Sequence, residues 1–327
     1  VGTHSVVLRA ADGDGLASTQ SFTITVANIN DVGSVALSGT FAEDQTVTAT
    51  VTDDDNDGTS DTYTYSWERS ADLNSWTSVG SNSATYSLSQ SDVGKYIRVT
   101  ASYTDDDGTV ESHSDTHLTA VANVNDDPTG SVVIANAASA AEDVTLTITN
   151  TLADEDGLGS FSYQWARAGS AISGATSATY TLVQADVGST ITVTVSYTDA
   201  QGTAESATSS ATSAVANVND DPTGSVAISG TATEDQTLSI TNTLADEDGL
   251  GSFSYQWARA GTAISGATSA TYALVQADVG STITVTVSYT DAQGTAESAT
   301  SAATSSVANV NDDPTGSVVI ANAASAA

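Results

Sequence analysis

The side chains of this sequence that could do chemistry are oxygen donors, and they occur in short acidic phrases that return along the chain. The longest phrase, Val-Ala-Asn-Val-Asn-Asp-Asp-Pro-Thr-Gly-Ser, stands at 121–131, 215–225 and 307–317, and Val-Ala-Asn-Ile-Asn-Asp stands at 26–31. Carboxylate and amide oxygens are the ligands that calcium prefers in proteins. The recurrence therefore indicates a cation site that is built several times.

Composition narrows the chemistry further. The chain has 327 residues, with 40 acidic against 6 basic side chains and a net charge of −34, so nucleic acid and direct insertion into an anionic membrane are not expected. It has no cysteine, which excludes disulfides and thiolate metal sites. No apolar run approaches the roughly 20 residues of a membrane span. No catalytic motif of the serine-hydrolase, P-loop or zinc-protease kind occurs, so we do not expect an enzyme.

The elements that must hold these phrases are predicted to be strands. In the segment 189–199, Ile191, Val193 and Val195 alternate with threonines, which is the pattern of a half-buried strand. Helical three-four periodicity is absent from the chain. The sequence therefore predicts an all-β protein.

The phrases mark a repeat of about 93 residues. Pro128, Pro222 and Pro314 are 94 and 92 residues apart, and 148–169 is identical to 240–261. Each repeat holds about seven predicted strands and one tryptophan expected in the core, which is typical of an antiparallel β-sandwich. The predicted boundaries are 1–32 for the last strands of a preceding domain, 33–127, 128–221 and 222–313 for three repeats, and 314–327 for the start of a fourth.

Alternating strand directions place the acidic phrases at the junctions between repeats. Between the first two repeats we expect Glu43 and Asp92 from one repeat, 123–127 from the linker, and Asp154, Asp156 and Asp199 from the next. No lysine or arginine is expected nearby, and so many carboxylates cannot remain ionised together without a counter-charge. A calcium ion, with about six to eight oxygen ligands, would supply it. For Asp92, Asp186 and Asp278 the alternative is that the carboxylate caps a turn.

The predicted metal ligands share a place in an acidic phrase at a junction. Thr64 stands where an EF-hand needs its glutamate, so the loop that begins at Asp53 is not predicted to be an EF-hand. The predicted ligands are Asn28, Asn30, Asp31, Glu43, Asp53, Asp55, Asp57, Asp105, Asn123, Asn125, Asp126, Asp127, Glu142, Asp154, Asp156, Asp199, Asn217, Asn219, Asp220, Asp221, Glu234, Asp246, Asp248, Asp291, Asn311, Asp312 and Asp313.

The linker 123–128 resembles the Asp-x-Asn-Asp-x-Pro motif of cadherins, with Asn123 in place of the first aspartate. Glu43 or Glu142 resembles the early glutamate of that family, and the 154–156 stretch resembles its Asp-x-Asp. The resemblance implies that calcium clamps successive domains together and stiffens them. The repeat bodies resemble immunoglobulin-like repeats of large calcium-dependent bacterial surface adhesins, of the kind found in RTX adhesins.

These features together predict tandem immunoglobulin-like or cadherin-like β-sandwiches in an extended array. The expected function is a calcium-stiffened spacer of a secreted bacterial surface adhesin, outside the cell, whose partners are the neighbouring repeats of the same chain. The alternative is a module that binds a glycan or a protein partner, or a subunit that associates sideways with like chains in a fibre.

Overall fold

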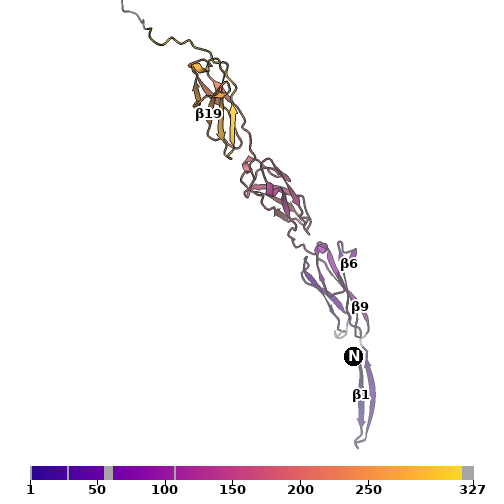
Figure 1. Cartoon of the computed structure of the whole chain (residues 1–327). Helices are drawn as coiled ribbons and strands as arrows, with labels where there is room; N and C mark the ends of the chain where they lie inside the picture. Colours follow the sequence, from indigo (N-terminus) through magenta and orange to yellow (C-terminus); the bar gives the residue numbers. More distant parts are fainter. Residues whose placement is uncertain (1, 28, 55–61, 107, 319–327) are drawn as a thin grey trace, which may run out of the picture. The chain divides into compact units, whose positions relative to one another are not determined.

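The computed structural model describes residues 2–27, 29–54, 62–106 and 108–318, and nearly all of its regular secondary structure is β-strand (Figure 1). Asn28, Asp55 and Asp57, three of the predicted ligands, lie outside the described residues. The chain is a series of tandem antiparallel β-sandwiches, as the alternating pattern predicted.

The first sandwich has seven strands in two sheets. One sheet has the order β3-β4-β7 and the other the order β6-β5-β8-β9, with antiparallel pairing throughout. The strands are β3 (Ser34–Ser38), β4 (Thr46–Thr52), β5 (Thr64–Ser70), β6 (Trp76–Val79), β7 (Thr85–Ser87), β8 (Tyr96–Thr104) and β9 (Val110–His117), and η1 (Gln90–Asp92) is a 3-10 turn between β7 and β8.

The second and third sandwiches repeat this topology, with the sheets β10-β11-β14 and β13-β12-β15-β16, then β17-β18-β21 and β20-β19-β22-β23. The second contains β10 (Val132–Ala135), η2 (Ala137–Ser139), β11 (Thr145–Asn150), β12 (Ser162–Arg167), β13 (Ser170–Ala171), β14 (Thr179–Thr181), η3 (Gln184–Asp186), β15 (Ile191–Thr198) and β16 (Ala204–Thr208). The third contains β17 (Val226–Ser229), β18 (Thr237–Asn242), β19 (Ser254–Arg259), β20 (Thr262–Ala263), β21 (Thr271–Ala273), η4 (Gln276–Asp278), β22 (Ile283–Thr290) and β23 (Ala296–Thr300).

The core follows from the period-two pattern. Along β15, buried Ile191, Val193 and Val195 alternate with half-buried threonines, so one face of the strand is apolar. Trp67, Trp165 and Trp257 are at most 1% exposed, which confirms the prediction that they are core residues. Because each sandwich buries its own apolar face, the acidic loops can be displayed at its ends without disturbing the core.

The N-terminal segment forms a two-stranded hairpin, β1 (Gly2–Ala11) and β2 (Ala17–Val26). Asp12 accepts backbone hydrogen bonds from Asp14 and Leu16 through Oδ1, so it shapes the hairpin turn. All described residues of the hairpin are exposed. That it closes a preceding domain stays a prediction.

By its internal packing the chain divides into two compact units. One contains 1–130, Thr151–Phe161 and Ser196–Ala207, and the other contains the rest. Two loops of the second repeat therefore group with the first sandwich and its linker, and the repeat boundaries stay predictions. The first junction lies wholly within the first unit, and the second junction lies wholly within the second unit.

Candidate metal centres

The turn after β3 presents Glu43. Asp44 adopts a left-handed φ of 59°, a conformation that aspartate tolerates better than most residues, and it reverses the chain directly after the glutamate. The backbone N–H of Glu43 donates to the carbonyl of Ala122 at 2.9 Å. The glutamate is therefore held against the beginning of the linker, and only 2% of it is exposed.

The linker begins as part of its own sandwich. Val121 is buried, its N–H donates to the Lys95 carbonyl at 2.8 Å, and its carbonyl accepts from the Gly94 N–H at 2.9 Å. These bonds tie the linker to the turn before β8. The oxygen donors that follow, from Asn123 to Asp127, consequently start from a fixed point.

The loop between β11 and β12 supplies the third part of the first site. Asp154 accepts the N–H of Asp156 at 2.9 Å and the hydroxyl of Tyr197, so the loop is tightly folded. Asp156 in turn accepts the N–H of Asp126 at 2.9 Å through Oδ2. This bond brings the linker and the loop together and places Glu155 beside Asp126 of the linker.

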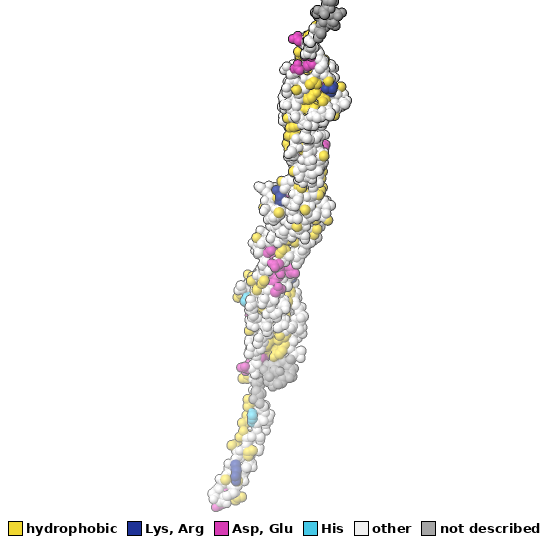
Figure 2. Space-filling model, turned by 60° about the vertical axis from the view of Figure 1, so that its left-hand side comes forward, with side chains coloured by type: hydrophobic (Ala, Val, Ile, Leu, Met, Phe, Trp, Pro, Cys, Tyr) yellow, Lys and Arg dark blue, Asp and Glu magenta, His cyan; other side chains and the backbone are white. Residues whose placement is uncertain are grey.

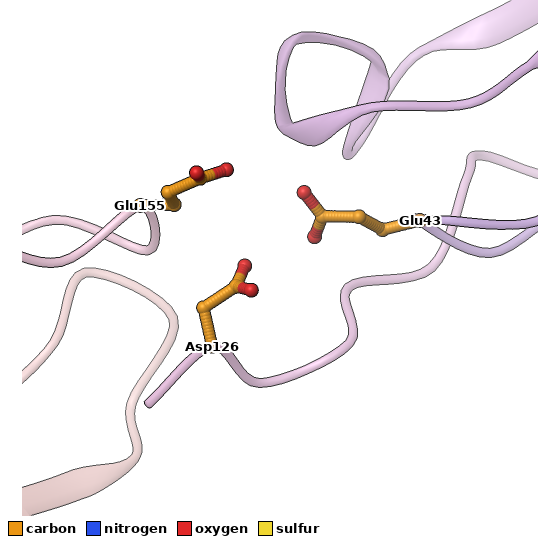
Figure 3. Close-up of side chains that lie close together, drawn as sticks. All are labelled: Glu43, Asp126 and Glu155. Atoms are coloured by element: carbon orange, nitrogen blue, oxygen red, sulfur yellow. The ribbon is translucent and has the colours of Figure 1, made fainter. Parts of the chain in front are cut away.

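At this junction Glu43, Asp126 and Glu155 each contribute a carboxylate oxygen to a group whose members lie within 4.8 Å of one another. Figure 3 shows the three carboxylates directed towards a common space from three separate stretches of chain. Glu43 is buried, Asp126 is half-buried and Glu155 is exposed. The arrangement therefore opens to solvent on one side and is closed on the other.

The same arrangement is built a second time, from Glu142, Asp220 and Glu247. Glu142 is 3% exposed, and the N–H of Asp220 donates to Asp248 at 2.9 Å, which matches the bond between Asp126 and Asp156. On the face drawn in Figure 2, acidic side chains likewise gather in a few patches. Two copies with the same arrangement indicate that the cluster is a property of the repeat.

The electrostatics of the clusters are unfavourable without a cation. Burial, reinforced by the charge of Asp126, raises the pKa of Glu43, although the Val124 N–H acts in the opposite direction. Burial and the charge of Asp156 raise the pKa of Asp126.

The second cluster behaves in the same way. Burial and the charge of Asp220 raise the pKa of Glu142, and burial and the charge of Asp248 raise the pKa of Asp220. Among the described residues, Oε2 of Glu43 and Oε2 of Glu142 accept no hydrogen bond. A bound cation would satisfy these oxygens and offset the repulsion.

Other predicted ligands are near these clusters but already have partners. Asp199 accepts the N–H groups of Gln201 and Thr203 through Oδ1, whereas its Oδ2 is buried without a partner among the described residues. Asn125 donates to Glu205 at 2.9 Å. The second junction repeats these bonds. Asp291 accepts the N–H groups of Gln293 and Thr295, and Asn219 donates to Glu297. Asp246 accepts the hydroxyl of Tyr289. Asp127 and Asp221 are exposed.

The N-terminal junction is organised differently. Asn30 Nδ2 and the Gly33 N–H each donate to Glu111 at 2.9 Å, and His113 is a further close partner. Together they lower the pKa of Glu111 to about 2, with Asn30 making the largest contribution. Asp53 accepts from the Tyr103 hydroxyl at 2.6 Å, Oδ1 of Asp105 accepts from Thr109, and Asp31 is exposed.

At the end of the third sandwich the predicted ligands are not gathered into a cluster. Glu234 is 3% exposed and accepts the N–H of Val310 at 3.2 Å. Asn311, Asp312 and Asp313 are exposed. Within the described ranges, the three-carboxylate group is therefore found at the two internal junctions.

One expectation is corrected. Asp92 was placed with the junction carboxylates, away from basic residues, but Arg69 Nη1 lies 3.2 Å from its Oδ1. Asp186 and Asp278 are paired with Arg167 and Arg259 in the same way, at 2.6 Å. The error arose because these arginines lie on β5, β12 and β19, far from the turn in sequence. The alternative reading, that each aspartate caps a turn, agrees with the structure, since Asp186 also accepts the Val183 N–H.

Sequence reasoning missed Glu155 and Glu247, the middle residues of the Asp-Glu-Asp phrases. The alternating aspartates predicted Asp154 and Asp156 as ligands instead. In the structure Asp154 accepts a hydrogen bond within the loop, and Asp156 accepts one from the linker. The repetition of the whole phrase was the available signal. Sequence reasoning also missed Gln90 and Gln184, which donate to the two Asp-Glu-Asp loops, because glutamine in a turn has no distinctive pattern.

No protein-family model matches the sequence, and no curated protein is significantly similar to it. Three of the solved structures to which this chain is similar are described by sequence identity, TM-score and coverage. A Ca2+-stabilised adhesin of an Antarctic bacterium that binds ice has 16% identity and a TM-score of 0.29, over 94% of this chain and 82% of that one. A tetra-tandem repeat from the extending region of a large adhesion protein has 17% identity and a TM-score of 0.28, over 92% of this chain and 81% of that one. A titin segment has 12% identity and a TM-score of 0.26, over 93% of this chain and 99% of that one. TM-scores of this size support no inference about function.

The part of the chain that the structure describes contains no helix long and apolar enough to cross a membrane.

Proposed function

We propose that this chain is a calcium-binding spacer, a stalk segment of a large extracellular bacterial adhesin or surface fibre in which calcium binds at the junctions between repeats. The observation that carries the proposal is the cluster of Glu43, Asp126 and Glu155, which recurs as Glu142, Asp220 and Glu247. Each cluster draws one carboxylate from a sandwich, one from the linker and one from the loop that follows.

The donor set favours calcium. Every candidate ligand is an oxygen, and the chain has no cysteine to attract zinc or copper. Calcium accepts about six to eight oxygens in irregular geometry, whereas magnesium requires near-octahedral coordination and keeps several waters. The open side of the cluster, where Glu155 is exposed, leaves room for water ligands.

An ion at this place would act mechanically. It would bind three stretches of chain that are joined by a linker, so bending the linker would break metal–ligand bonds. Extracellular calcium modules bind with Kd near 0.1–1 mM, and calcium at about 100 times Kd adds about 2.7 kcal/mol per site. Such a site would be filled outside a cell and empty in the cytosol, which agrees with a surface location.

The experiment is small-angle X-ray scattering of the chain in millimolar calcium, in millimolar magnesium and in excess chelator, at constant ionic strength. We expect a stiffer particle in calcium than in the other two conditions. The variant Glu43→Gln/Glu142→Gln should resemble the chelated protein in every condition, and Glu234→Gln is the matched control. Identical scattering in calcium and chelator would contradict the spacer mechanism and favour a glycan-binding or fibre-forming role.

A further inference from the structure

One glutamine occupies the same position in all three sandwiches and has two different sets of partners. Gln90, Gln184 and Gln276 begin the 3-10 turns η1, η3 and η4. The turns share one backbone conformation, since the carbonyl of each glutamine accepts the N–H three residues later, at 3.2–3.3 Å. Any difference between their side chains therefore comes from the surroundings.

At the internal junctions the glutamine holds the loop that follows. Gln90 Nε2 donates to the carbonyl of Glu155 and to Oδ1 of Asp156, both at 2.9 Å. Gln184 Nε2 donates to Oδ1 of Asp248, also at 2.9 Å. The other oxygen of Asp156 accepts the N–H of Asp126 in the linker, so Gln90 and the linker both donate to the same carboxylate.

At the end of the third sandwich the glutamine turns to its own linker. Gln276 Nε2 donates to Oδ1 of Asn309 at 3.3 Å, and both residues are exposed. Asn309 is the counterpart of Asn123 and Asn217 in the repeated phrase. Here no loop of the Asp-Glu-Asp type lies against the glutamine among the described residues.

The contacts at the internal junctions leave two amide oxygens at each of them without a donor among the described residues. At the internal junctions Gln90 Oε1 and Asn123 Oδ1 are buried, and within the described chain neither accepts a hydrogen bond. At the second junction Gln184 Oε1 and Asn217 Oδ1 are likewise buried and accept no hydrogen bond among the described residues. A buried acceptor without a donor is destabilising, because it has lost its hydrogen bond to water.

These orphaned atoms all belong to one chemical class. They are neutral amide oxygens. Each junction also has one unpartnered glutamate oxygen, that of Glu43 at the first and that of Glu142 at the second, and both glutamates are at least 97% buried. These oxygens are buried, whereas Gln276 and Asn309 are exposed to solvent. A hard cation is the species that all of them can bind at once.

We propose that the buried amide oxygens of Gln90 with Asn123, and of Gln184 with Asn217, bind the junction cation, while the amide nitrogen of each glutamine holds the following loop. The inference rests on the proposed function and adds a coupling to it: one glutamine side chain contacts both the following loop and the cation. By linkage, docking of the loop and binding of the cation strengthen each other by the same factor.

The test is a calcium chloride titration of the whole chain by isothermal calorimetry, with Gln90→Ala/Gln184→Ala as the variant and Gln276→Ala as the matched control. We expect the double variant to bind calcium at least about tenfold more weakly, as loss of supporting groups around a metal does. The control should bind like the wild type. Gln184→Ala alone should weaken one junction and leave the other at its original affinity, which separates a local effect from misfolding.

A second variant separates the two roles of the glutamine. Gln90→Glu/Gln184→Glu keeps an oxygen for the cation but loses the N–H donor to Asp156 and Asp248, so in chelator its junctions should be looser by small-angle scattering than those of the wild type. Equal calcium affinity for wild type and Gln90→Ala/Gln184→Ala would overturn the inference, as would an equal loss in Gln276→Ala. If the wild type itself takes up no calcium, the proposed function fails first and the inference with it.

Discussion

Arg167 Nε lies 2.6 Å from Oδ1 of Asp186, and the same fully buried carboxylate accepts the hydroxyl of Tyr180 and the N–H of Val183 at 2.9 Å. This aspartate has a cation and two further donors supplied by the protein. Oε2 of Glu142 has no partner among the described residues. The buried acidic side chains of the repeat therefore divide into those that the protein pairs with a basic side chain and those that it leaves with an unpartnered oxygen.

We expect Asp186→Ala to destabilise the second sandwich by about 2–4 kcal/mol, because it leaves Arg167 and Tyr180 without their shared acceptor. The loss should be the same in calcium and in chelator, since Asp186 is not part of a cation cluster. Denaturant unfolding followed by tryptophan fluorescence, in Asp186→Ala and in the wild type, measures it. A loss that appears only in calcium would mean that Asp186 acts at the junction after all.

Glu43→Gln/Glu142→Gln should lower calcium affinity at least about tenfold, because each substitution removes the buried charge of a cluster. In chelator the same variant should be as stable as the wild type or more stable, since a buried carboxylate without a counter-charge is lost. Calorimetric titration and thermal unfolding check the two parts. Glu234→Gln, at the same position of the third sandwich, should leave the affinity unchanged; a variant that is weaker in calcium and also unstable in chelator would indicate a purely structural glutamate.

In chelator, stability should fall as the pH rises. The pKa values of Glu43 and Glu142 are raised above 4.5, so the folded chain binds more protons than the unfolded chain between the unfolded and folded pKa values. The stabilisation is complete below the unfolded value and is lost as the pH rises through the folded one.

Calcium binds the ionised carboxylates and should remove or reverse this trend. Thermal unfolding at several pH values above about 4.5 measures the trend, because Glu111, with a pKa lowered to about 2, acts in the opposite direction at lower pH. Glu43→Gln/Glu142→Gln should flatten the dependence in chelator. An equally steep slope in that variant would assign the effect to other groups.

Glu155 and Asp156 should have separable roles although they are neighbours. Glu155→Gln should weaken calcium binding and leave the junction in chelator unchanged, because its carboxylate faces the cluster and is exposed. Asp156→Asn should loosen the junction even in chelator, because it replaces one of the two oxygens that accept from Gln90 and Asp126. Scattering in chelator, together with calcium titration, distinguishes the two. Equal behaviour of both variants would contradict this assignment.

Gly159→Ala should weaken calcium binding without altering any ligand. A Cβ at Gly159 would lie 2.0 Å from the carbonyl oxygen of Thr198, so the loop that carries Glu155 would have to move. Gly13→Ala is the control, because a Cβ there meets nothing within 4 Å. Calcium titration measures the change, and an unchanged affinity in Gly159→Ala would show that the position of the loop is not critical.

Much of the fold follows from local pattern. Alternation of apolar residues with threonine predicts the strands, because side chains on a strand point to opposite faces, and β15 follows that pattern residue by residue. The repeat spacing predicts similar sandwiches, and each has seven strands. That acidic phrases meet at the junctions follows from strand direction alone, which is how Glu43 and Asp126 could be paired before any coordinates.

The sequence by itself therefore determined the strands, the repeat and the meeting of carboxylates, because these depend on periodicity and direction. Tertiary structure alone decided which carboxylate receives which donor. It paired Asp186 with an arginine from another strand, and it directed Glu155 rather than Asp156 into the cluster. It also gave Gln184 the carboxylate of Asp248 as a partner, although the two residues are 64 apart in sequence. Local sequence cannot encode such a pairing, because it depends on which loop lies within hydrogen-bond distance.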